Sequence, residues 1–423
     1  MRLVHFVDST DLRDGGVPRF VLDAARVMAE AGHPSTIFTM DTTDSPHAWV
    51  ANRGDIDGLT PLSSQIPLVR HVQNSRLGGK ILNPEAMRNI RAAVQQADVV
   101  HLHCVWSLAN LQVAAACRAM GVPYVISAHG MLDDWSMTQG QLKKKIYMRL
   151  GGRTMLERAA HVHCTAEGEA EQAQRWFPAG RAFITPYLMD LADFRSLPGE
   201  EAATNAFACV REAKASGTPV VLFLSRVHHK KGIELLIDAA AELRSRGQRA
   251  CYVIAGTGEQ AYIDSLVARA TAAGVADMIH FVGMVKRATK ISLYQAADLF
   301  ALPTSQENFG LVLTEAMACG TPVVTTTGTD IWKDIASSGA GVIADRSGVA
   351  FADAIGSLLA DRSKLREMAS KARPWVFANF SEDVLTQRFV QMYETAMGQP
   401  AHVEVKPMRL PVLRNLQRVA ATL

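Results

Sequence analysis

The sequence lacks several features that would identify a secreted or membrane-spanning protein. Its 423 residues contain six cysteines, which are scattered through apolar segments and never fall in CxxC spacing. This pattern excludes a disulfide framework and predicts reduced thiols in a cytoplasmic protein. No apolar run reaches the about 18 residues of a membrane-spanning helix. The N-terminal segment MRLVHFVDST is too short, and too polar towards its end, for a secretory signal.

The sequence also lacks a large excess of charge of either sign. The 44 lysines and arginines nearly balance the 41 acidic residues, and the net charge of +3 is too small to indicate a nucleic-acid partner. Hydrophobic residues make up 48% of the chain and charged residues 20%, which is typical of a globular enzyme with a large core. The length predicts two or three domains.

Short apolar runs alternate with helical segments along most of the chain. One series runs from RLVHFVDS near the N-terminus to RAFITPY at 181–187, and a second begins with PVVLFLS at 219–225. This alternation predicts an α/β protein of two doubly wound, Rossmann-like domains facing a central cleft. The stretch 191–205 loses apolar periodicity, and we interpret it as the linker. The predicted domains are 1–195 and 196–380, followed by C-terminal helices in 381–423 that cross back to the first domain.

The most informative motif is PTSQENFGLVLTEAMACGTPVV, from Pro303 to Val324. An apolar strand is expected to end at Pro303, and a helix to begin at Leu311. Ligands of open α/β sheets bind outside the carboxyl ends of the strands, and a helix N-terminus there favours an anion. Glu307 would lie at this edge and Glu315 about one turn into the helix. Carboxylates so close to an anion site suit hydroxyl groups, so the motif predicts a ligand that is both phosphorylated and polyhydroxylated.

A basic turn, SRVHHKKG, follows the first strand of the second series. Arg226 and Lys231 flank this turn at the carboxyl end of the strand. Arginine supplies a forked donor and lysine a point charge, so the pair can hold a pyrophosphate without a metal ion. Lys230 is more simply explained as a solvated surface charge.

Two weaker signals lie at strand ends of the first domain. Gly15 and Gly16 separate the first strand from the first helix, where glycine lets the backbone approach a phosphate closely. The pattern is not GxGxxG, which disfavours a dinucleotide, and an ordinary tight turn remains an alternative. His129 closes the strand PYVISAHG, where it can hydrogen-bond a substrate hydroxyl or move a proton; a loop histidine without such a role is the alternative.

Two sequence patterns resemble metal-binding motifs, but neither is sufficient to predict a metal site. HLHC at 101–104 and HVHC at 161–164 each place two histidines on one face of a strand, but the strands need not be neighbours and no carboxylate follows in ligand spacing. Two strands with polar ends are the favoured interpretation. The acidic triplet DID at 55–57 follows no clear strand. We therefore predict no metal site.

A basic, partly amphipathic stretch, QLKKKIYMRLGGRTMLER, contains Lys143, Lys144, Lys145 and Arg149. Such a stretch can rest on an anionic membrane surface or hold a lipid diphosphate. The alternative is a solvated helix face.

Taken together, these motifs resemble the retaining glycosyltransferases of family 4, which have the GT-B fold. The resemblance covers nearly the whole chain and rests on GG near the N-terminus, SAHG, the SRxxxxKG turn, CYVIAGTGE, FVGMV and the E-x7-E string ENFGLVLTEAMACGTPVV. Two places depart from the family. TPYLMD stands where a PNG-type turn is frequent, and Gly328, Thr329 and Asp330 stand where a second glycine pair is frequent.

The resemblance implies that a nucleotide sugar is held by residues of both domains. They are Gly15, Gly16, Arg226, Lys231, Gly310 and Leu311 at the diphosphate; Glu315 at the ribose; Val282, Met284, Gly256 and Gly258 at the base; and Glu307, Asn308, Phe309 and His129 at the sugar. Glu307 and His129 are the expected catalytic residues.

The resemblance also implies the reaction. A sugar would pass from a UDP- or GDP-sugar to a saccharide or polyprenol-linked acceptor in exopolysaccharide or lipopolysaccharide assembly, with retained configuration and the leaving phosphate as base. No metal and no cofactor besides the nucleotide sugar are expected. The enzyme would be cytoplasmic and peripheral at the inner membrane face. A nucleotide-sugar epimerase of the same fold, or an inactive nucleotide-sugar-binding subunit, is the alternative.

Overall fold

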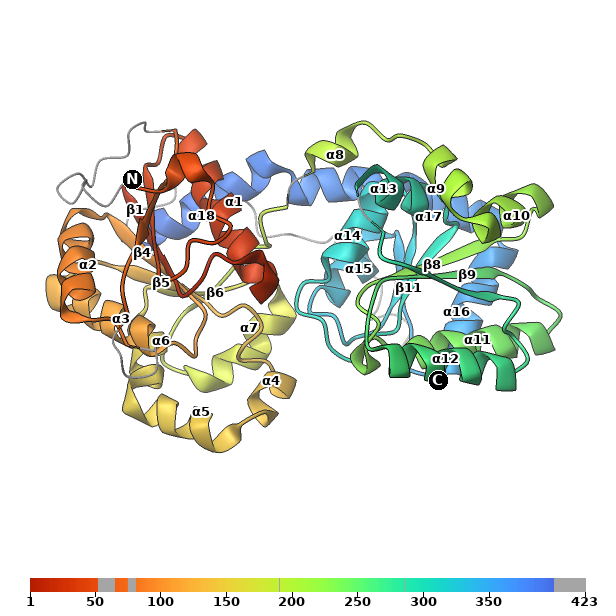
Figure 1. Ribbon diagram of the computed structural model, residues 1–423, viewed down its shortest axis with the longest axis horizontal. Coiled ribbons are helices and arrows are strands. Elements are labelled where there is room, and N and C mark those ends of the chain that lie inside the picture. The colour runs from red at the N-terminus through yellow and green to blue at the C-terminus, as the bar shows by residue number, and fades with distance from the viewer. Residues whose placement is uncertain (52–64, 75–80, 190, 286, 399–423) are drawn as a thin grey trace, which may run out of the picture. The chain divides into compact units, whose positions relative to one another are not determined.

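The computed structural model describes residues 1–51, 65–74, 81–189, 191–285 and 287–398, and these form two compact units (Figure 1). Unit 1 comprises the described residues up to 189 together with helix α18 (Glu382–Ala396), and unit 2 comprises residues 191–381. The acidic triplet at 55–57 and the chain beyond residue 398 lie outside the described residues.

Unit 1 contains, within its described residues, a seven-stranded parallel sheet in the order β3-β2-β1-β4-β5-β6-β7. The strands are β1 (Leu3–Val7), β2 (Ser35–Thr39), β3 (Leu68–His71), β4 (Val99–His103), β5 (Tyr124–Ser127), β6 (His161–Cys164) and β7 (Ala182–Ile184). All five residues of β1 and of β4 are buried, as expected for central strands of a sheet that is covered on both faces.

Helices cover both faces of this sheet. In Figure 1, α1 (Gly16–Glu30) and α18 lie together on one face, and α2 (Pro84–Gln96), α3 (Leu108–Met120) and α6 (Arg153–Arg158) lie on the other. The shorter segments are α4 (Asp134–Thr138), α5 (Gln141–Tyr147), the π-helix η3 (Met148–Gly152), α7 (Glu167–Ala173), and the 3-10 turns at Leu12–Asp14, His47–Trp49 and Gln174–Trp176.

The two faces of β4 differ in chemistry because side chains alternate along a strand. Val100 and Leu102 join the apolar core, which includes Ile90 of α2 and Val113 of α3. His101 and His103 point to the opposite face and contact side chains of α1 and α18. Unit 1 therefore has one apolar and one polar layer beneath its helices.

Unit 2 contains a six-stranded parallel sheet, again counted over the described residues, in the order β10-β9-β8-β11-β12-β13. The strands are β8 (Val220–Leu224), β9 (Cys251–Ala255), β10 (Ile279–Gly283), β11 (Leu299–Leu302), β12 (Val323–Thr325) and β13 (Gly341–Ile343). Its helical segments are α8 (Ala192–Arg195), α9 (Glu201–Ala206), α10 (Ala208–Ser216), η5 (His229–Lys231), α11 (Ile233–Ser245), α12 (Gln260–Ala272), α13 (Arg287–Ala296), α14 (Leu311–Ala318), α15 (Trp332–Ser338), α16 (Gly348–Ala360) and α17 (Arg362–Phe380). Figure 1 shows α11, α12 and α16 on one face and α9, α13 and α14 on the other.

The stretch 191–205, interpreted from the sequence as the linker, contains helical segments. This stretch carries α8 and the first part of α9, and α9 packs on α13 within unit 2. Ala203 is fully buried, and its backbone N–H donates to Ser292 Oγ at 2.9 Å. The helices are short and mostly exposed, so too few apolar positions recur to produce a helical pattern.

The predicted fold class, two doubly wound α/β sheets, is confirmed. In each sheet the strand order reverses beside the first strand, between β1 and β4 in unit 1 and between β8 and β11 in unit 2. Such a reversal opens a ligand site at the carboxyl ends of the two strands. Among the described residues, no helix combines the length and apolarity needed to cross a membrane.

Candidate active site

The reversal point of unit 2 brings together the basic turn and the first acid of the E-x7-E motif. Lys231 ends η5, which follows β8, and Glu307 lies in the loop after β11, the neighbouring strand. The Lys231 ammonium forms an ion pair with the Glu307 carboxylate. Gly232 makes this approach possible: its φ is +69°, and a Cβ there would collide with the carbonyl oxygen of Pro303 at the end of β11. The sequence prediction that both side chains share one strand edge is consistent with this geometry.

Lys231 is buried within this positive turn. Burial, Arg226 and Lys230 lower the pKa of Lys231 to about 8. Contact with the Glu307 carboxylate opposes that shift, because an adjacent negative charge favours the ammonium form. Arg226 itself is exposed. Of the two cations expected at the diphosphate, Lys231 is therefore fixed by an ion pair, whereas Arg226 reaches solvent.

The backbone around Glu307 is tied to the loop after β12. The Glu307 N–H donates to the Gly328 carbonyl at 2.8 Å, and the Asp330 N–H donates to the Glu307 carbonyl at 3.1 Å. A Cβ at Gly328 would lie 2.7 Å from the carbonyl oxygen of Thr304, so only glycine fits there. Residues 328–330, where this sequence differs from the family pattern, thus hold the backbone of Glu307 in place.

Glu315 lies in the second turn of α14, which begins after Gly310 at a φ of +75°. Lys290 Nζ contacts one Glu315 carboxylate oxygen at 2.7 Å, and the Tyr294 hydroxyl donates to the other at 2.9 Å. Burial beside Glu315 raises the pKa of Tyr294 far above its usual value, so Tyr294 remains a hydroxyl donor. A carboxylate has further lone pairs, so Glu315 can accept additional hydrogen bonds while it keeps both partners.

Lys290 and Tyr294 were not predicted from the sequence. They lie one turn apart on α13, which places them on the same side of that helix. The four-residue spacing could have indicated that the two side chains act together. It does not indicate which carboxylate they contact.

The glycines predicted at the base have a packing role. A Cβ at Gly256 would collide with the Ser225 carbonyl, and one at Gly258 with the Val227 carbonyl. They therefore let the loop after β9 lie directly on the turn after β8. Met284, which follows β10, exposes 59% of its surface and is available to border a ligand, and Val282 is half-buried.

Phe309, which is expected to help hold the sugar, has a buried side chain. Phe309 is only 2% exposed, and its ring packs edge-on against Phe380 with 5.6 Å between centroids. Its side chain therefore belongs to the core, and only its backbone is left for a ligand. Leu311, by contrast, is 42% exposed at the first turn of α14, where backbone N–H groups lack intrahelical acceptors.

The carboxyl edge of the unit 1 sheet carries two unusual backbone conformations. Cys104 after β4 and His129 after β5 have φ values of +70° and +51°, and they are the non-glycine residues with positive φ in the described chain. Such strain concentrates at functional sites. Gly15 has a φ of +109°, and a Cβ at Gly15 or Gly16 would meet no atom within 4 Å, so this loop borders open space.

His129 is held on both sides of its ring. Its Nε2 is hydrogen-bonded to His103 Nδ1 at 3.3 Å and its Nδ1 to the Tyr187 hydroxyl at 3.0 Å. The following residue, Gly130, donates its N–H to the buried Glu169 carboxylate at 2.6 Å. The sequence identified His129 but missed Tyr187 and Glu169, which lie far from it along the chain.

The HLHC and HVHC strands are β4 and β6, separated by β5. The two strands with polar ends are therefore not neighbours, and Ser127 of β5 connects them. Ser127 Oγ is hydrogen-bonded to His101 Nε2 at 2.7 Å and to His163 Nδ1 at 2.6 Å. A single polar network therefore crosses three strands of unit 1.

The basic stretch forms α5, η3 and α6. Leu142, Ile146 and Leu150 are exposed by 73%, 48% and 72%, at four-residue spacing, and so form one apolar stripe. Lys143, Lys145 and Arg149 are exposed beside it. Lys144 differs from the prediction: its ammonium donates to the Ser136 carbonyl at 2.6 Å and lies 4.9 Å from the Trp106 ring centroid, so it is a structural rather than a surface charge.

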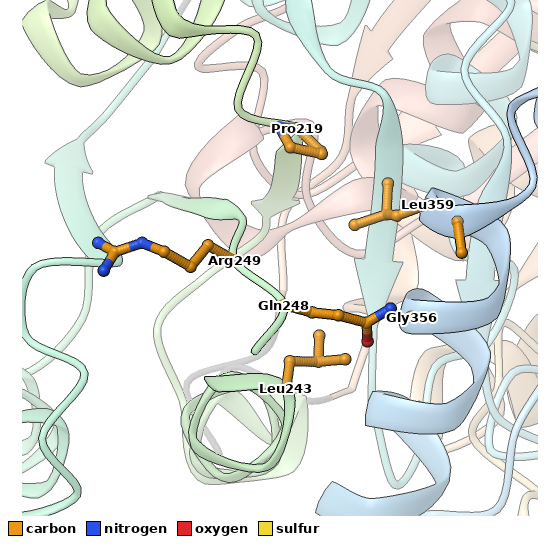
Figure 2. Close-up of a pocket in the computed structure, with 7 residues that line it drawn as sticks. Pro219, Leu243, Gln248, Arg249, Gly356 and Leu359 are labelled. Atoms are coloured by element: carbon orange, nitrogen blue, oxygen red, sulfur yellow. The ribbon is translucent and has the colours of Figure 1, made fainter. Parts of the chain in front are cut away.

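A small cavity of unit 2 does not belong to this site. Figure 2 shows its lining by Pro219, Leu243, Gln248, Arg249 and Gly356, with a volume of about 150 Å³. Pro219 and Arg249 precede β8 and β9, so the cavity lies at the amino ends of these strands, opposite Lys231.

Both units match models of known protein families. Residues 15–187 match the glycosyl transferase 4-like domain, and residues 209–375 match glycosyl transferases group 1. A D-inositol 3-phosphate glycosyltransferase of Nocardiopsis dassonvillei is 31% identical over 336 residues, covering 73% of this chain and 73% of that protein. The protein of that name from Nocardia farcinica is 28% identical over 406 residues, covering 91% and 86%.

Solved structures show the same fold at lower identity. Anabaena HepE in complex with UDP superposes with a TM-score of 0.68 at 20% identity, covering 93% of this chain and all of that one. A glycosyltransferase from Rickettsia africae gives a TM-score of 0.70 at 15% identity, covering 94% and 99%. The chain therefore belongs to the family 4 glycosyltransferases and has their GT-B fold.

Proposed function

We propose that this glycosyltransferase moves a sugar from a nucleoside diphosphate sugar to a hydroxyl acceptor, with retained anomeric configuration and without a metal ion. One observation carries the proposal: Lys231 and Glu307 form an ion pair at the reversal point of unit 2, with Glu315 in the adjoining helix. The site thus combines a cation for phosphate with carboxylates for hydroxyls.

The cations of unit 2 suit the charge that develops during transfer. As the bond between the anomeric carbon and the diphosphate breaks, negative charge grows on the leaving phosphate oxygen. Lys231, Arg226 and the first backbone N–H groups of α14 would stabilise that charge. The acceptor hydroxyl then bonds to the anomeric carbon from the same face, and its proton passes to the leaving phosphate oxygen.

Glu307 and Glu315 would each bind hydroxyl groups of a different part of the donor. Glu315, supported by Lys290 and Tyr294, is proposed for the ribose. Glu307 is proposed for the transferred sugar, with the backbone of Asn308 and Phe309 beside it. His129 in unit 1 is proposed to act on a sugar hydroxyl, directly or through its partners.

A uridine nucleotide is the favoured donor. The fold neighbour HepE was crystallised with UDP and with UDP-glucose, which supports a UDP-sugar by analogy of fold. The relatives named as D-inositol 3-phosphate glycosyltransferases make a phosphorylated polyol a second acceptor class to test.

The stripe on α5 supports a lipid-linked saccharide as the favoured acceptor. Exposed leucine and isoleucine flanked by Lys143, Lys145 and Arg149 match an anionic membrane surface, where apolar side chains insert and cations meet lipid phosphates. We propose peripheral binding through this surface.

The test is a transfer assay with UDP-, GDP- and ADP-sugars, run with inositol phosphate or with a polyprenol-linked saccharide. We expect a retained product with a UDP-sugar that persists in EDTA. Loss of activity in EDTA would overturn the metal-free mechanism. A new sugar formed without acceptor would indicate an epimerase, and product only with inositol phosphate would overturn the lipid-linked acceptor.

A further inference from the structure

Two cysteines of unit 2 lie against each other although 42 positions separate them along the chain. Cys209 is in the first turn of α10, and Cys251 begins β9, a strand on which α10 packs. Cys251 Sγ lies within hydrogen-bond distance of the Cys209 carbonyl oxygen, at 3.7 Å, and a hydrogen bond also joins the two thiols. The packing of one helix end on one strand thus brings two sulfur atoms together.

The two thiols differ in their access to solvent. Cys209 is half-buried, whereas Cys251 is only 6% exposed. A small reagent in solution can therefore meet Cys209 directly, and Cys251 lies behind it.

The surroundings of Cys209 favour its thiolate. The hydrogen bond from Cys251 is the main cause that lowers the pKa of Cys209; burial opposes it, and the backbone N–H groups of Cys209 and Val210 add to it. The first N–H groups of a helix lack intrahelical acceptors, and the positive end of the helix dipole attracts a negative sulfur. Because the thiolate is the nucleophilic form of cysteine, Cys209 is the reactive member of the pair.

Cys251 stays protonated beside that thiolate. Its hydrogen bond to Cys209 raises its pKa most, and burial and the negative charge of Cys209 raise it further. The first and the last of these causes depend on a charged Cys209, so they disappear once that sulfur is oxidised to a neutral group. Cys251 is therefore a proton donor before Cys209 reacts, and its thiolate becomes easier to form afterwards.

The other four cysteines lack this combination. Burial raises the pKa of Cys104, Cys117 and Cys319 to about 12, so these thiols stay protonated near pH 7. Cys164 is fully buried. These four residues are internal controls within the same molecule.

We propose that Cys209 and Cys251 form a peroxide-reactive site, in which Cys209 is oxidised first and Cys251 then forms a disulfide with it. In the first step the Cys209 thiolate attacks one oxygen of hydrogen peroxide, the O–O bond breaks, and a sulfenic acid and hydroxide form. In the second step the Cys251 sulfur attacks the sulfenic sulfur, the S–O bond breaks, and the oxygen leaves as water with the Cys251 proton. The two sulfur atoms give up two electrons, and one peroxide becomes water and hydroxide.

The disulfide would protect Cys209 from permanent damage. A sulfenic acid without a second thiol is oxidised further to sulfinic and sulfonic acids, which thiol reductants do not reverse, whereas a disulfide is reduced by thiol exchange. Cys251 is at the amino end of β9, and Lys231 follows the carboxyl end of the neighbouring strand β8. The site is thus separate from the sugar-transfer site, and the proposal does not depend on the proposed function.

The first test maps the thiols of the wild-type protein. The reduced protein is treated with hydrogen peroxide, free thiols are alkylated, and peptides are analysed by mass spectrometry without reduction. We expect a peptide pair joined through Cys209 and Cys251, which dithiothreitol separates. Without peroxide, iodoacetamide near pH 7 should label Cys209 roughly tenfold faster than Cys104, Cys117 or Cys319. Equal labelling rates, or free Cys209 after peroxide, would overturn the site.

Two matched variants separate the roles of the two thiols. Cys251→Ser keeps a hydroxyl donor but removes the second sulfur, so dimedone should trap a sulfenic acid at Cys209 and longer exposure should give sulfinic acid there. Cys209→Ser should leave Cys251 unmodified, because that thiol is buried. Sulfinic acid at Cys209 of the wild type without any disulfide would remove Cys251 from the reaction. Thermal unfolding checks that both variants fold, and the wild-type peptide map decides the proposal if either does not.

Discussion

The carboxyl edges of the two sheets differ in the charge of the side chains that they carry. In unit 2 the edge is ionic: Lys231 pairs with Glu307, and Lys290 pairs with Glu315. In unit 1 it is neutral: His129 is linked to His103 and Tyr187 by hydrogen bonds between uncharged groups. The contrast teaches that one topology can support either a charged or a neutral site, according to which side chains follow its strands.

The difference follows from the cost of burying charge. An ion pair loses hydration when it is buried, so it persists best where water still reaches one partner. The side chains of Glu307 and Lys290 keep about a quarter of their surface exposed, at 26% and 27%. His5, His101, His103 and His163 of unit 1 are almost completely buried, and desolvation keeps them neutral. Under the proposed function, a developing phosphate charge would therefore be stabilised by unit 2, and unit 1 would bind neutral hydroxyl groups.

The largest expected effect separates the units by acid stability. The pKa of His5 and of His163 is about 4 in the folded protein, against 6.5 when unfolded. Between pH 6.5 and about 4 the unfolded chain binds the additional protons, so stability falls with pH by about 1.4 kcal/mol per unit for each histidine. At pH 5 these two alone cost roughly 4 kcal/mol. Hydrogen exchange, corrected for its intrinsic pH dependence, should show unit 1 losing protection first.

Unit 2 is the internal control for that experiment. Its histidines, His228, His229 and His280, are exposed or half-buried, so the same acidification should affect it less. Glu169 of unit 1 acts in the opposite sense, because burial raises its pKa in the folded protein above the unfolded value. Equal loss of protection in both units would mean that the neutral histidine layer does not govern acid stability.

The ionic edge is tested by removing one carboxylate. Glu307→Ala and Glu307→Gln should each lower transfer by about 10²- to 10³-fold, or roughly 3–4 kcal/mol, as expected when one electrostatic group is lost from a reacting centre. Leaving the buried Lys231 ammonium unpaired contributes to this loss. Steady-state kinetics with the best donor measure the effect.

Glu367→Gln is a matched control for that substitution, because Glu367 also pairs with a lysine, Lys371, but is largely exposed on α17. Its activity should equal that of the wild type. Full activity in Glu307→Ala would remove Glu307 from the site.

The smallest expected effect concerns the surface of α5. Lys143→Gln with Lys145→Gln should weaken binding to vesicles that contain anionic lipid by roughly 2 kcal/mol, about 1 kcal/mol for each basic side chain. Vesicle co-sedimentation measures this change. A pair of exposed cations in unit 2, Lys364 and Arg366, provides the control double substitution to Gln. Equal binding by the wild type and the α5 variant would exclude this surface as the membrane contact.

Much of the architecture was predictable because it depends on local pattern. The series expected to run from RLVHFVDS to RAFITPY begins with β1 and ends with β7, and the run PVVLFLS contains β8. The positions of Glu307 and Lys231 were also predictable, since parallel strands of one sheet place their carboxyl ends at one edge. The short helices at 191–206 were not, because few of their side chains are buried.

The sequence by itself determined the two α/β units, the strand edge that carries Lys231 and Glu307, and the family to which the chain belongs. Only the tertiary structure decided which side chains meet. Tyr187 contacts His129 across 58 residues, and Tyr393 reaches His101 across 292. Such contacts depend on strand order and on which face each helix covers, which no local pattern records. The same is true of Phe309, whose side chain packs into the core although its motif predicts a ligand contact.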